Sequence, residues 1–236
     1  MNIEQGTNPI FLFLYVSIMV VYLLRYISHK QNNAKRRQPH RDALLEFVIT
    51  SDFIFSKEKS ESIISRYSQT KLITKSSEDR EVSHLISGKM NDRDIRLFDL
   101  KYSVSNGKTR VVYEYSAAAI EFPTIFSDLY ISSENILNKM AGLAGFDDIN
   151  FESEEFNKAF YVKSSNKKFA YDIINSSIMQ LLLANKKWTI EFNSNVILIY
   201  KKGVFINGEY DQAIEFFTNF IDLIPEYIIC ENLNSQ

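Results

Sequence analysis

Several residue types are scarce in this 236-residue sequence, and each scarcity excludes a class of protein. A single cysteine, Cys230, rules out an internal disulfide, which suits a reducing compartment. With 7 glycines and 4 prolines, the chain does not have the composition of a disordered or low-complexity protein. The hydrophobic fraction of 45% and the charged fraction of 24% are typical of globular proteins. We therefore expect a folded chain, long enough for one domain with appendages or at most two small domains.

Histidines are also few, which limits the chemistry available. His29 and His40 lie in a basic segment and His84 stands alone, so neither a histidine-based zinc site nor a Ser-His-Asp arrangement is indicated. Ser87-Gly88-Lys89 lacks the upstream glycine of a phosphate-binding loop. Cys230 has no basic neighbour in the sequence that would activate its thiol. The sequence predicts no catalytic residue, no cofactor and no metal.

Carboxylates are the remaining candidates for chemistry. Their oxygens could hold a hard cation, but calcium loops need a tighter alternation of acids and a glycine turn. A solvated acidic surface is therefore the favoured interpretation, and a carboxylate-based enzyme stays open as an alternative. The candidates are Asp92 with Asp94, and a second group that consists of Asp147, Asp148, Glu152, Glu154 and Glu155.

An uncharged, apolar run stands out near the N-terminus. Between Ile10 and Leu24, eleven residues are Leu, Ile, Phe or Val. This run predicts a transmembrane helix over 9–27, close to the roughly 20 residues that cross about 30 Å of hydrocarbon. A cleaved signal peptide would need an early basic region and a cleavage site of small residues, and both are missing. A buried core helix would normally keep a polar stripe, which this run lacks.

The segment 25–41, which follows the apolar run, contains six basic residues and no acid. The basic residues are Arg25, Lys30, Lys35, Arg36, Arg37 and Arg41. The positive-inside rule keeps such a flank in the cytoplasm. It predicts a single-pass protein of the inner (plasma) membrane, with a short extracytoplasmic tail over 1–8. The same side chains could contact the anionic membrane surface, although an ordinary topology signal is the favoured explanation.

The remaining sequence is predicted to contain a basic juxtamembrane linker over 28–40, a cytoplasmic α+β domain over 41–228 and a flexible tail over 229–236. From Asp42 onward acids outnumber bases, which argues against nucleic acid as a partner, because its binding depends on Lys and Arg at phosphates. Strong turn residues and alternation predict the fold class: antiparallel β-hairpins packed with helices.

The clearest hairpin surrounds Asn106-Gly107, with strands over 94–104 and 109–120 that show a period of two. A second hairpin is predicted from 188–192 and 196–200, with a turn over 193–195. An earlier strand starts at Val82, and 160–163 has strand character. Apolar spacing predicts helices over 42–49, 56–67, 133–143, 168–185 and 209–224, the last ending at Pro225. The segment 68–80 is predicted to be a surface loop.

One stretch, Asp148–Val162, is similar to an uncharacterised bacterial group of membrane-anchored proteins that carry a domain of unknown function. The features that recur in that group are a Glu-Ser pair, two spaced Phe, a Val and a downstream helix, here Glu152-Ser153, Phe156, Phe160, Val162, Ala170–Ile174 and Met179–Leu182. Ile86–Lys89 and Arg96–Asp99 resemble the strand pair of the group. Asn166-Lys167-Lys168 departs from it, because an acidic residue usually precedes the helix there. The resemblance implies membrane association and supplies no activity.

These patterns predict a non-enzymatic interaction module at the inner face of the membrane. Anchoring would raise its effective concentration for a protein partner in the same lipid bilayer. Binding of the membrane surface is the other form of this prediction. A membrane-tethered enzyme with a carboxylate-based site is the alternative.

Overall fold

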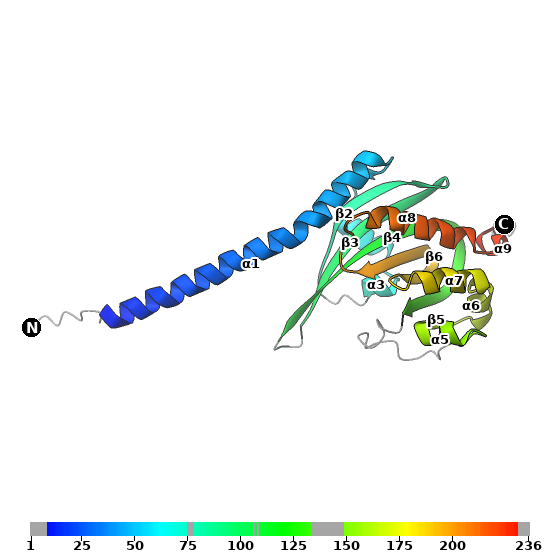
Figure 1. Ribbon diagram of the computed structural model, residues 1–236. Coiled ribbons are helices and arrows are strands. Elements are labelled where there is room, and N and C mark those ends of the chain that lie inside the picture. Colours follow the sequence, from blue (N-terminus) through cyan, green and yellow to red (C-terminus); the bar gives the residue numbers. More distant parts are fainter. Residues whose placement is uncertain (1–8, 75–77, 106, 108, 134–148, 231–236) are drawn as a thin grey trace, which may run out of the picture. The chain divides into compact units, whose positions relative to one another are not determined.

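The structure is a computed structural model that describes residues 9–74, 78–105, 107, 109–133 and 149–230 (Figure 1). Within α1, side chains are described at 18–25 and from residue 38 onward. The chain divides into two units, Met1–Asp42 and Ala43–Gln236. The predicted helix over 133–143 falls almost wholly outside the described residues, as do Asp147 and Asp148.

One helix, α1 (Pro9–Thr50), includes all the described residues of the first unit and continues into the second. The predicted linker over 28–40 is therefore helical, Pro39 included. Within the described residues, no helix meets the length and apolar character that crossing a membrane requires. The predicted transmembrane helix over 9–27 and the single-pass membrane assignment are wrong, whereas the predicted location stays untested.

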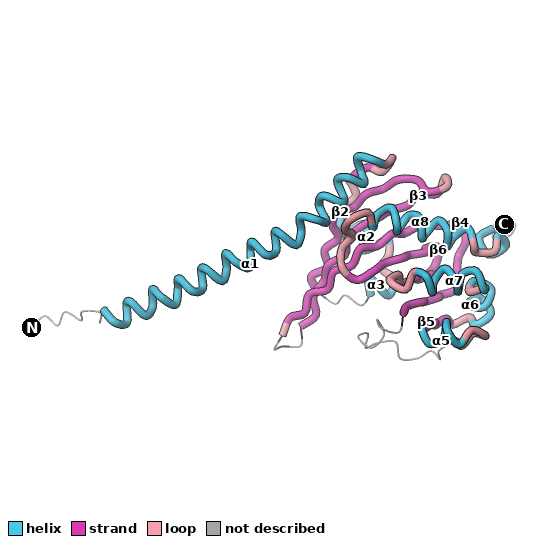
Figure 2. Tube along the Cα trace, viewed as in Figure 1, coloured by secondary structure: helices cyan, strands magenta, loops and turns pink. Residues whose placement is uncertain are grey.

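The second unit combines helices with an antiparallel sheet, so the predicted mixed α+β character is confirmed (Figure 2). Its strands are β1 (Ile54–Phe55), β2 (Glu78–Met90), β3 (Arg93–Ser105), β4 (Arg110–Ser133), β5 (Phe160–Ser164) and β6 (Thr189–Lys202). Beside the end of α1, its helices are α2 (Ser60–Arg66), α3 (Lys71–Thr74), α5 (Glu154–Ala159), α6 (Lys167–Ile173), α7 (Ser176–Ala184), α8 (Glu209–Asp222) and α9 (Glu226–Cys230).

Strand β4 is the centre of the sheet. Its first half lies between β3 and β6, and its second half lies between β5 and β6. Beyond β3 come β2 and then β1, so β1 forms one edge of the sheet. The strands are antiparallel throughout. A strand of 24 residues is long because it serves two sets of neighbours in succession.

Apolar side chains cover both faces of the sheet, in the alternation that a period of two produces. On β3, Leu97 belongs to the larger hydrophobic cluster and Leu100 to the smaller one. The larger cluster includes Phe217 and other residues of α8, which lies over this face in Figure 1. The smaller cluster is closed by Ile63 and Tyr67, at α2. Because both faces are packed, the edges of the sheet are where its backbone can meet other molecules.

The predicted hairpin at Asn106-Gly107 is confirmed, with Ser105 opposite Arg110 at its tip. The returning strand does not end at residue 120, as predicted, but continues through Pro123 to Ser133. Proline is tolerated there because the pairing with β6 is interrupted between Glu121 and Phe126. The residue without an N–H group therefore sits where the ladder is already irregular.

The predicted second hairpin is wrong, because 189–202 forms the single strand β6. Ser194 takes a positive φ of 52° without reversing the chain, and it lies opposite Phe126 at the irregular part of β4. Ile190 and Leu198, on either side, both pair with β4. The two strands thus bend together, and the turn residues accommodate a bend.

Two helical predictions also need correction. The single helix predicted over 168–185 is split into α6 and α7, since the Asn175 side chain accepts a hydrogen bond from Ile178 N–H at 3.0 Å and starts a new helix. The loop predicted over 68–80 contains α3, which buries Leu72 and Ile73. Helix α8 and strand β5 agree with the predictions for 209–224 and 160–163. Helix α2 is shorter than the predicted 56–67.

Replacing Gly88 with alanine is expected to destabilise the second unit by about 1–3 kcal/mol. A methyl group on Gly88 would lie 2.7 Å from the ring of Phe53, which is itself buried. Urea denaturation would measure the change in the free energy of unfolding. Ser87→Ala, one residue earlier, is the control and should cost about 0.5 kcal/mol or less. Adding Phe53→Leu to Gly88→Ala should recover part of the loss if the clash is its cause.

Candidate interaction groove

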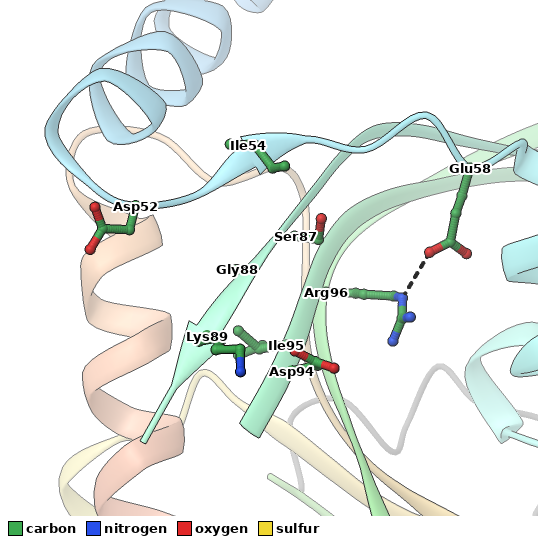
Figure 3. A pocket seen from close by; sticks show the side chains of 9 residues that line it. All are labelled: Asp52, Ile54, Glu58, Ser87, Gly88, Lys89, Asp94, Ile95 and Arg96. Atoms are coloured by element: carbon green, nitrogen blue, oxygen red, sulfur yellow. Dashed lines mark hydrogen bonds and ion pairs between the residues drawn. The ribbon is translucent and has the colours of Figure 1, made fainter. Parts of the chain in front are cut away.

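A groove of about 540 Å³ opens beside the edge strand β1 (Figure 3). The residues that decide its chemistry are Asp52, Ile54, Glu58, Lys89, Asp94 and Arg96. They come from the turn after α1, from β1 and its continuation, and from the paired strands β2 and β3. Lys89 lies opposite Asp94, and Ser87 opposite Arg96, so one face of this strand pair forms part of the lining.

Arg96 is the centre of an ion-pair network at the inner end of the groove. Its Nε donates to Glu58 Oε1 at 3.1 Å, and its Nη1 donates to Glu121 Oε1 at 3.2 Å. Arg66 approaches the same two carboxylates, at 3.5 Å from Glu58 and 3.3 Å from Glu121. The Tyr67 hydroxyl donates to Glu121 at 3.2 Å. Two arginines and two glutamates therefore balance each other here.

Burial and charge act in opposite directions on Arg96. Burial lowers the pKa of its guanidinium, but the hydrogen bond to Glu58 and the nearby carboxylates leave that pKa above its ordinary value. Burial, together with the charge of Glu121, raises the pKa of the Tyr67 phenol. Arg96 thus stays cationic and Tyr67 stays neutral. The network ties α2 to β3 and β4 and gives the groove a firm inner wall.

The outer part of the groove differs from this network. Asp52, Lys89 and Asp94 make no ion pair among the described residues. Ile54 is 66% exposed and Phe55 49% exposed, although both sit on a strand. Exposed apolar side chains on an edge strand are uncommon, because such an edge can pair with another chain. The groove thus joins a solvent-exposed apolar edge to uncompensated charge.

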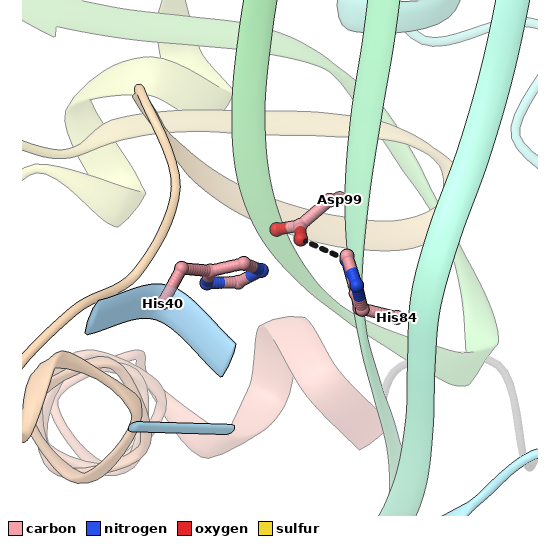
Figure 4. Close-up of side chains that lie close together, drawn as sticks. All are labelled: His40, His84 and Asp99. Atoms are coloured by element: carbon pink, nitrogen blue, oxygen red, sulfur yellow. Dashed lines mark hydrogen bonds and ion pairs between the residues drawn. The ribbon is translucent and has the colours of Figure 1, made fainter. Parts of the chain in front are cut away.

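A second polar group lies on the other face of β3. The His84 Nδ1 is 2.9 Å from Asp99 Oδ2 (Figure 4), and the Ser116 hydroxyl donates to the other oxygen of the same carboxylate. His84 has a positive φ of 51° in a bulge of β2, where the register shifts between Ser83 and Ile86. Asp99 lies between the histidine and the serine. A nucleophilic serine needs the histidine between itself and the acid, so this arrangement is not a catalytic triad.

A third group is buried on the face covered by α2 and α3. Tyr130 of β4 lies between Lys163 of β5 and Glu191 of β6, all three at most 4% exposed. Glu191 accepts a hydrogen bond from the backbone N–H of Lys71, whose Nζ lies 4.8 Å from the Tyr130 ring centre. Burial lowers the pKa of Lys71, against the opposing effect of Glu191. This group links three strands to α3 inside the fold.

Most sequence-predicted site residues lie away from the groove. Arg25 and Arg41 are exposed on α1, and the other predicted surface residues, Lys30, Lys35, Arg36 and Arg37, belong to α1 without described side chains. Among the predicted acids with described positions, Asp94 lines the groove. Asp92 is in the adjoining turn, and Glu152, Glu154 and Glu155 are exposed at or near α5.

Sequence reasoning missed the groove, the His84–Asp99 pair and the buried group around Tyr130. Arg96, Glu58 and Glu121 come from three separate segments, so no local spacing connects them. Asp99 alternates with apolar residues along β3, a pattern typical of a solvent-facing position, yet it is 6% exposed. His84 carried no local signal, because the bulge that directs it toward Asp99 depends on the register between two strands.

The sequence matches no family model and no curated protein. Among solved structures, the chain is similar to the crystal structure of the mycobacterial trehalose monomycolate transport factor A, TtfA. The TM-score is 0.58, the sequence identity is 9%, and the match covers 80% of this chain and 98% of that chain. At this identity the similarity shows a shared fold.

Proposed function

We propose that this protein is a non-enzymatic interaction module that binds a protein partner at the edge of its sheet, over β1 and the adjoining groove. The observation that carries the proposal is the exposure of Ile54 and Phe55, at 66% and 49%, on a strand at the sheet edge. Burying such side chains against a partner is favourable by roughly 25 cal/mol for each Å² of apolar surface. Contact with a partner would therefore remove an unfavourable feature of the free protein.

The chemistry of the groove supports binding better than catalysis. Glu58 is held between two arginines, and the described lining includes neither histidine nor cysteine. The structural neighbour TtfA is called a transport factor, a name that specifies no reaction. We take this as support for an accessory, binding role on the same fold. A carboxylate-based enzyme would have to use Asp52 and Asp94, on opposite sides of the groove opening, as its reactive pair.

Photo-crosslinking inside the producing cell tests this proposal. A benzophenone amino acid is placed at Ile54 in the full-length chain, and at Ile125 as the control, because Ile125 is 65% exposed on β4. The expected result is a crosslinked protein from residue 54 that is missing from residue 125. Mass spectrometry identifies that protein, and binding is then measured with the purified pair.

Phe55→Ser should weaken this purified complex about tenfold, because a partly buried aromatic contributes about 1.5 kcal/mol. Glu154→Gln, on exposed α5, should leave it unchanged. Identical crosslinks from residues 54 and 125, or none from residue 54, would refute a partner site at β1.

A further inference from the structure

We propose that the partner binds as an extended strand added to β1, with basic side chains received separately by Asp52 and by Asp94. This inference rests on the proposed function and specifies how the same edge recognises its partner. It depends on three features of the second unit: the direction of the β1 backbone groups, the apolar side chains of β1, and the charges that remain uncompensated in the groove.

The backbone of β1 offers an open pairing position. Ser56 N–H donates to Leu85 O at 2.9 Å, so Ser56 and Leu85 form a hydrogen-bonded pair. Pairs alternate along an antiparallel ladder, and Phe55 opposite Ile86 is therefore a non-hydrogen-bonded pair. In such a pair the N–H and C=O of each residue point away from the partner strand. The N–H and C=O of Phe55 thus point away from β2, toward the open edge of the sheet.

The side chains on either side of this position suit an extended ligand. Neighbouring residues of a strand project to opposite faces, so Ile54 faces the groove and Phe55 faces the other side. A strand laid along β1 would cover both at once. Its own side chains would alternate in the same way, and every second one would enter the groove. Strand addition of this kind obtains affinity from the main chain and specificity from alternate side chains.

The uncompensated charge of the groove determines which side chain of the partner strand enters it. Glu58 and Arg96 compensate each other, whereas Asp52, Asp94 and Lys89 have no ion-pair partner among the described residues. The uncompensated charge at the opening is therefore two acids against one base (Figure 3). A lysine or arginine of the partner would complement the acids. An acidic or fully apolar strand would leave them without compensation.

Native edge strands are often short, which limits unwanted pairing, and β1 has just two residues. A short edge strand that is also charged or covered is protected against such pairing. Here the two residues are Ile and Phe, both substantially exposed. The apolar pair beside an acidic opening therefore fits a specific ligand better than a protected edge.

The test uses a displayed library of random linear 12-residue peptides, selected on the full-length protein. The expected peptides share a Lys or Arg two residues from an apolar or β-branched residue. For a selected peptide, fluorescence anisotropy should show that Asp94→Asn and Asp52→Asn each weaken binding about two- to fivefold, as exposed ion pairs do. Asp211→Asn on α8, an exposed acid outside the groove, is the matched control and should change nothing.

Backbone methylation of the peptide tests strand addition directly. Methylating the N–H that faces Phe55 should abolish binding, whereas methylating the next N–H along should have little effect. Selected peptides without a basic residue, equal effects of the two methylations, or no selected peptide at all would each overturn the inference. The crosslink from residue 54 is independent of these results, so the proposed function can stand when the strand mode fails.

Discussion

Raising the pH above 10 is expected to unfold this protein cooperatively. The phenols responsible are at most 6% exposed and belong to Tyr67, Tyr102, Tyr130, Tyr200 and Tyr210. Burial raises the pKa of each above the ordinary value of 10.0, to about 12 for Tyr130. Each phenol must therefore be exposed before it can ionise readily.

The sign of this effect follows from proton counting. Below pH 10 both states hold the phenolic protons, so the stabilisation is fully present. Above pH 10 the unfolded chain loses them and the folded chain keeps them, so stability falls as the pH rises toward the folded values. The loss is about 1.4 kcal/mol for each buried phenol and pH unit. Several such groups together reach the 5–15 kcal/mol that holds a typical domain folded.

Lys71 has the opposite effect on the pH dependence of stability. Burial lowers its pKa below 10.5, so the unfolded chain binds more protons than the folded one between that lowered value and 10.5. Its contribution therefore improves with rising pH in that window. A single partly buried lysine opposes five buried phenols, and the tyrosines decide the net direction.

Phenolate absorbance and circular dichroism, followed together, measure the alkaline transition. Most of the phenolate signal is expected to appear in one step with the loss of secondary structure. Tyr130→Phe keeps the ring and removes one phenol, so above pH 10 its stability should fall less steeply than that of the parent, by about 1.4 kcal/mol per pH unit. Phenols that ionise gradually at pH 11 while the fold persists would contradict this explanation.

Phe217→Ala is expected to lower the free energy of unfolding by about 3–5 kcal/mol. The Phe217 ring is 0% exposed and belongs to the larger cluster, between α8 and the sheet. Its removal loses apolar burial and leaves a cavity that packed strands and helices cannot fully close. A loss of this size is a large share of the stability of an ordinary domain.

The matched control is Phe55→Ala, the same substitution at a ring that is 49% exposed. It should cost about 1 kcal/mol or less, because much of the ring already meets water. Urea denaturation followed by Trp188 fluorescence gives both values, since Trp188 is fully buried. Equal losses for the two variants would show that the larger cluster does not hold α8 on the sheet.

Local patterns predicted those parts of the fold that local rules determine. Asn106-Gly107 between alternating residues was sufficient for the β3–β4 hairpin, and apolar spacing identified α8. Asn193–Asn195 has the composition of a turn, but β4 supplies partners on both sides of it and keeps β6 continuous. The apolar run at the N-terminus satisfied a hydropathy rule, whereas the described part of α1 gives no membrane span.

The groove could not be predicted because its lining is a property of strand register. A shift of one residue between β2 and β3 would remove Arg96 from Glu58 and turn Asp94 to the other face. Ile54 and Phe55 were unremarkable in the sequence, because two apolar residues do not reveal which edge of a sheet they will occupy. Their exposure follows from the pairing of β1 with β2, which places both residues at the edge of the sheet.

The central position of β4 has a consequence for synthesis of the chain on the ribosome. Ala118 pairs with Ile199, so the edge of β4 that pairs with β6 has no partner until residues much later in the chain are translated. Until those residues emerge, this edge of β4 is unpaired and rich in apolar side chains, and it can associate with other nascent chains. A premature stop before β6 should therefore yield inclusion bodies in place of a smaller folded product.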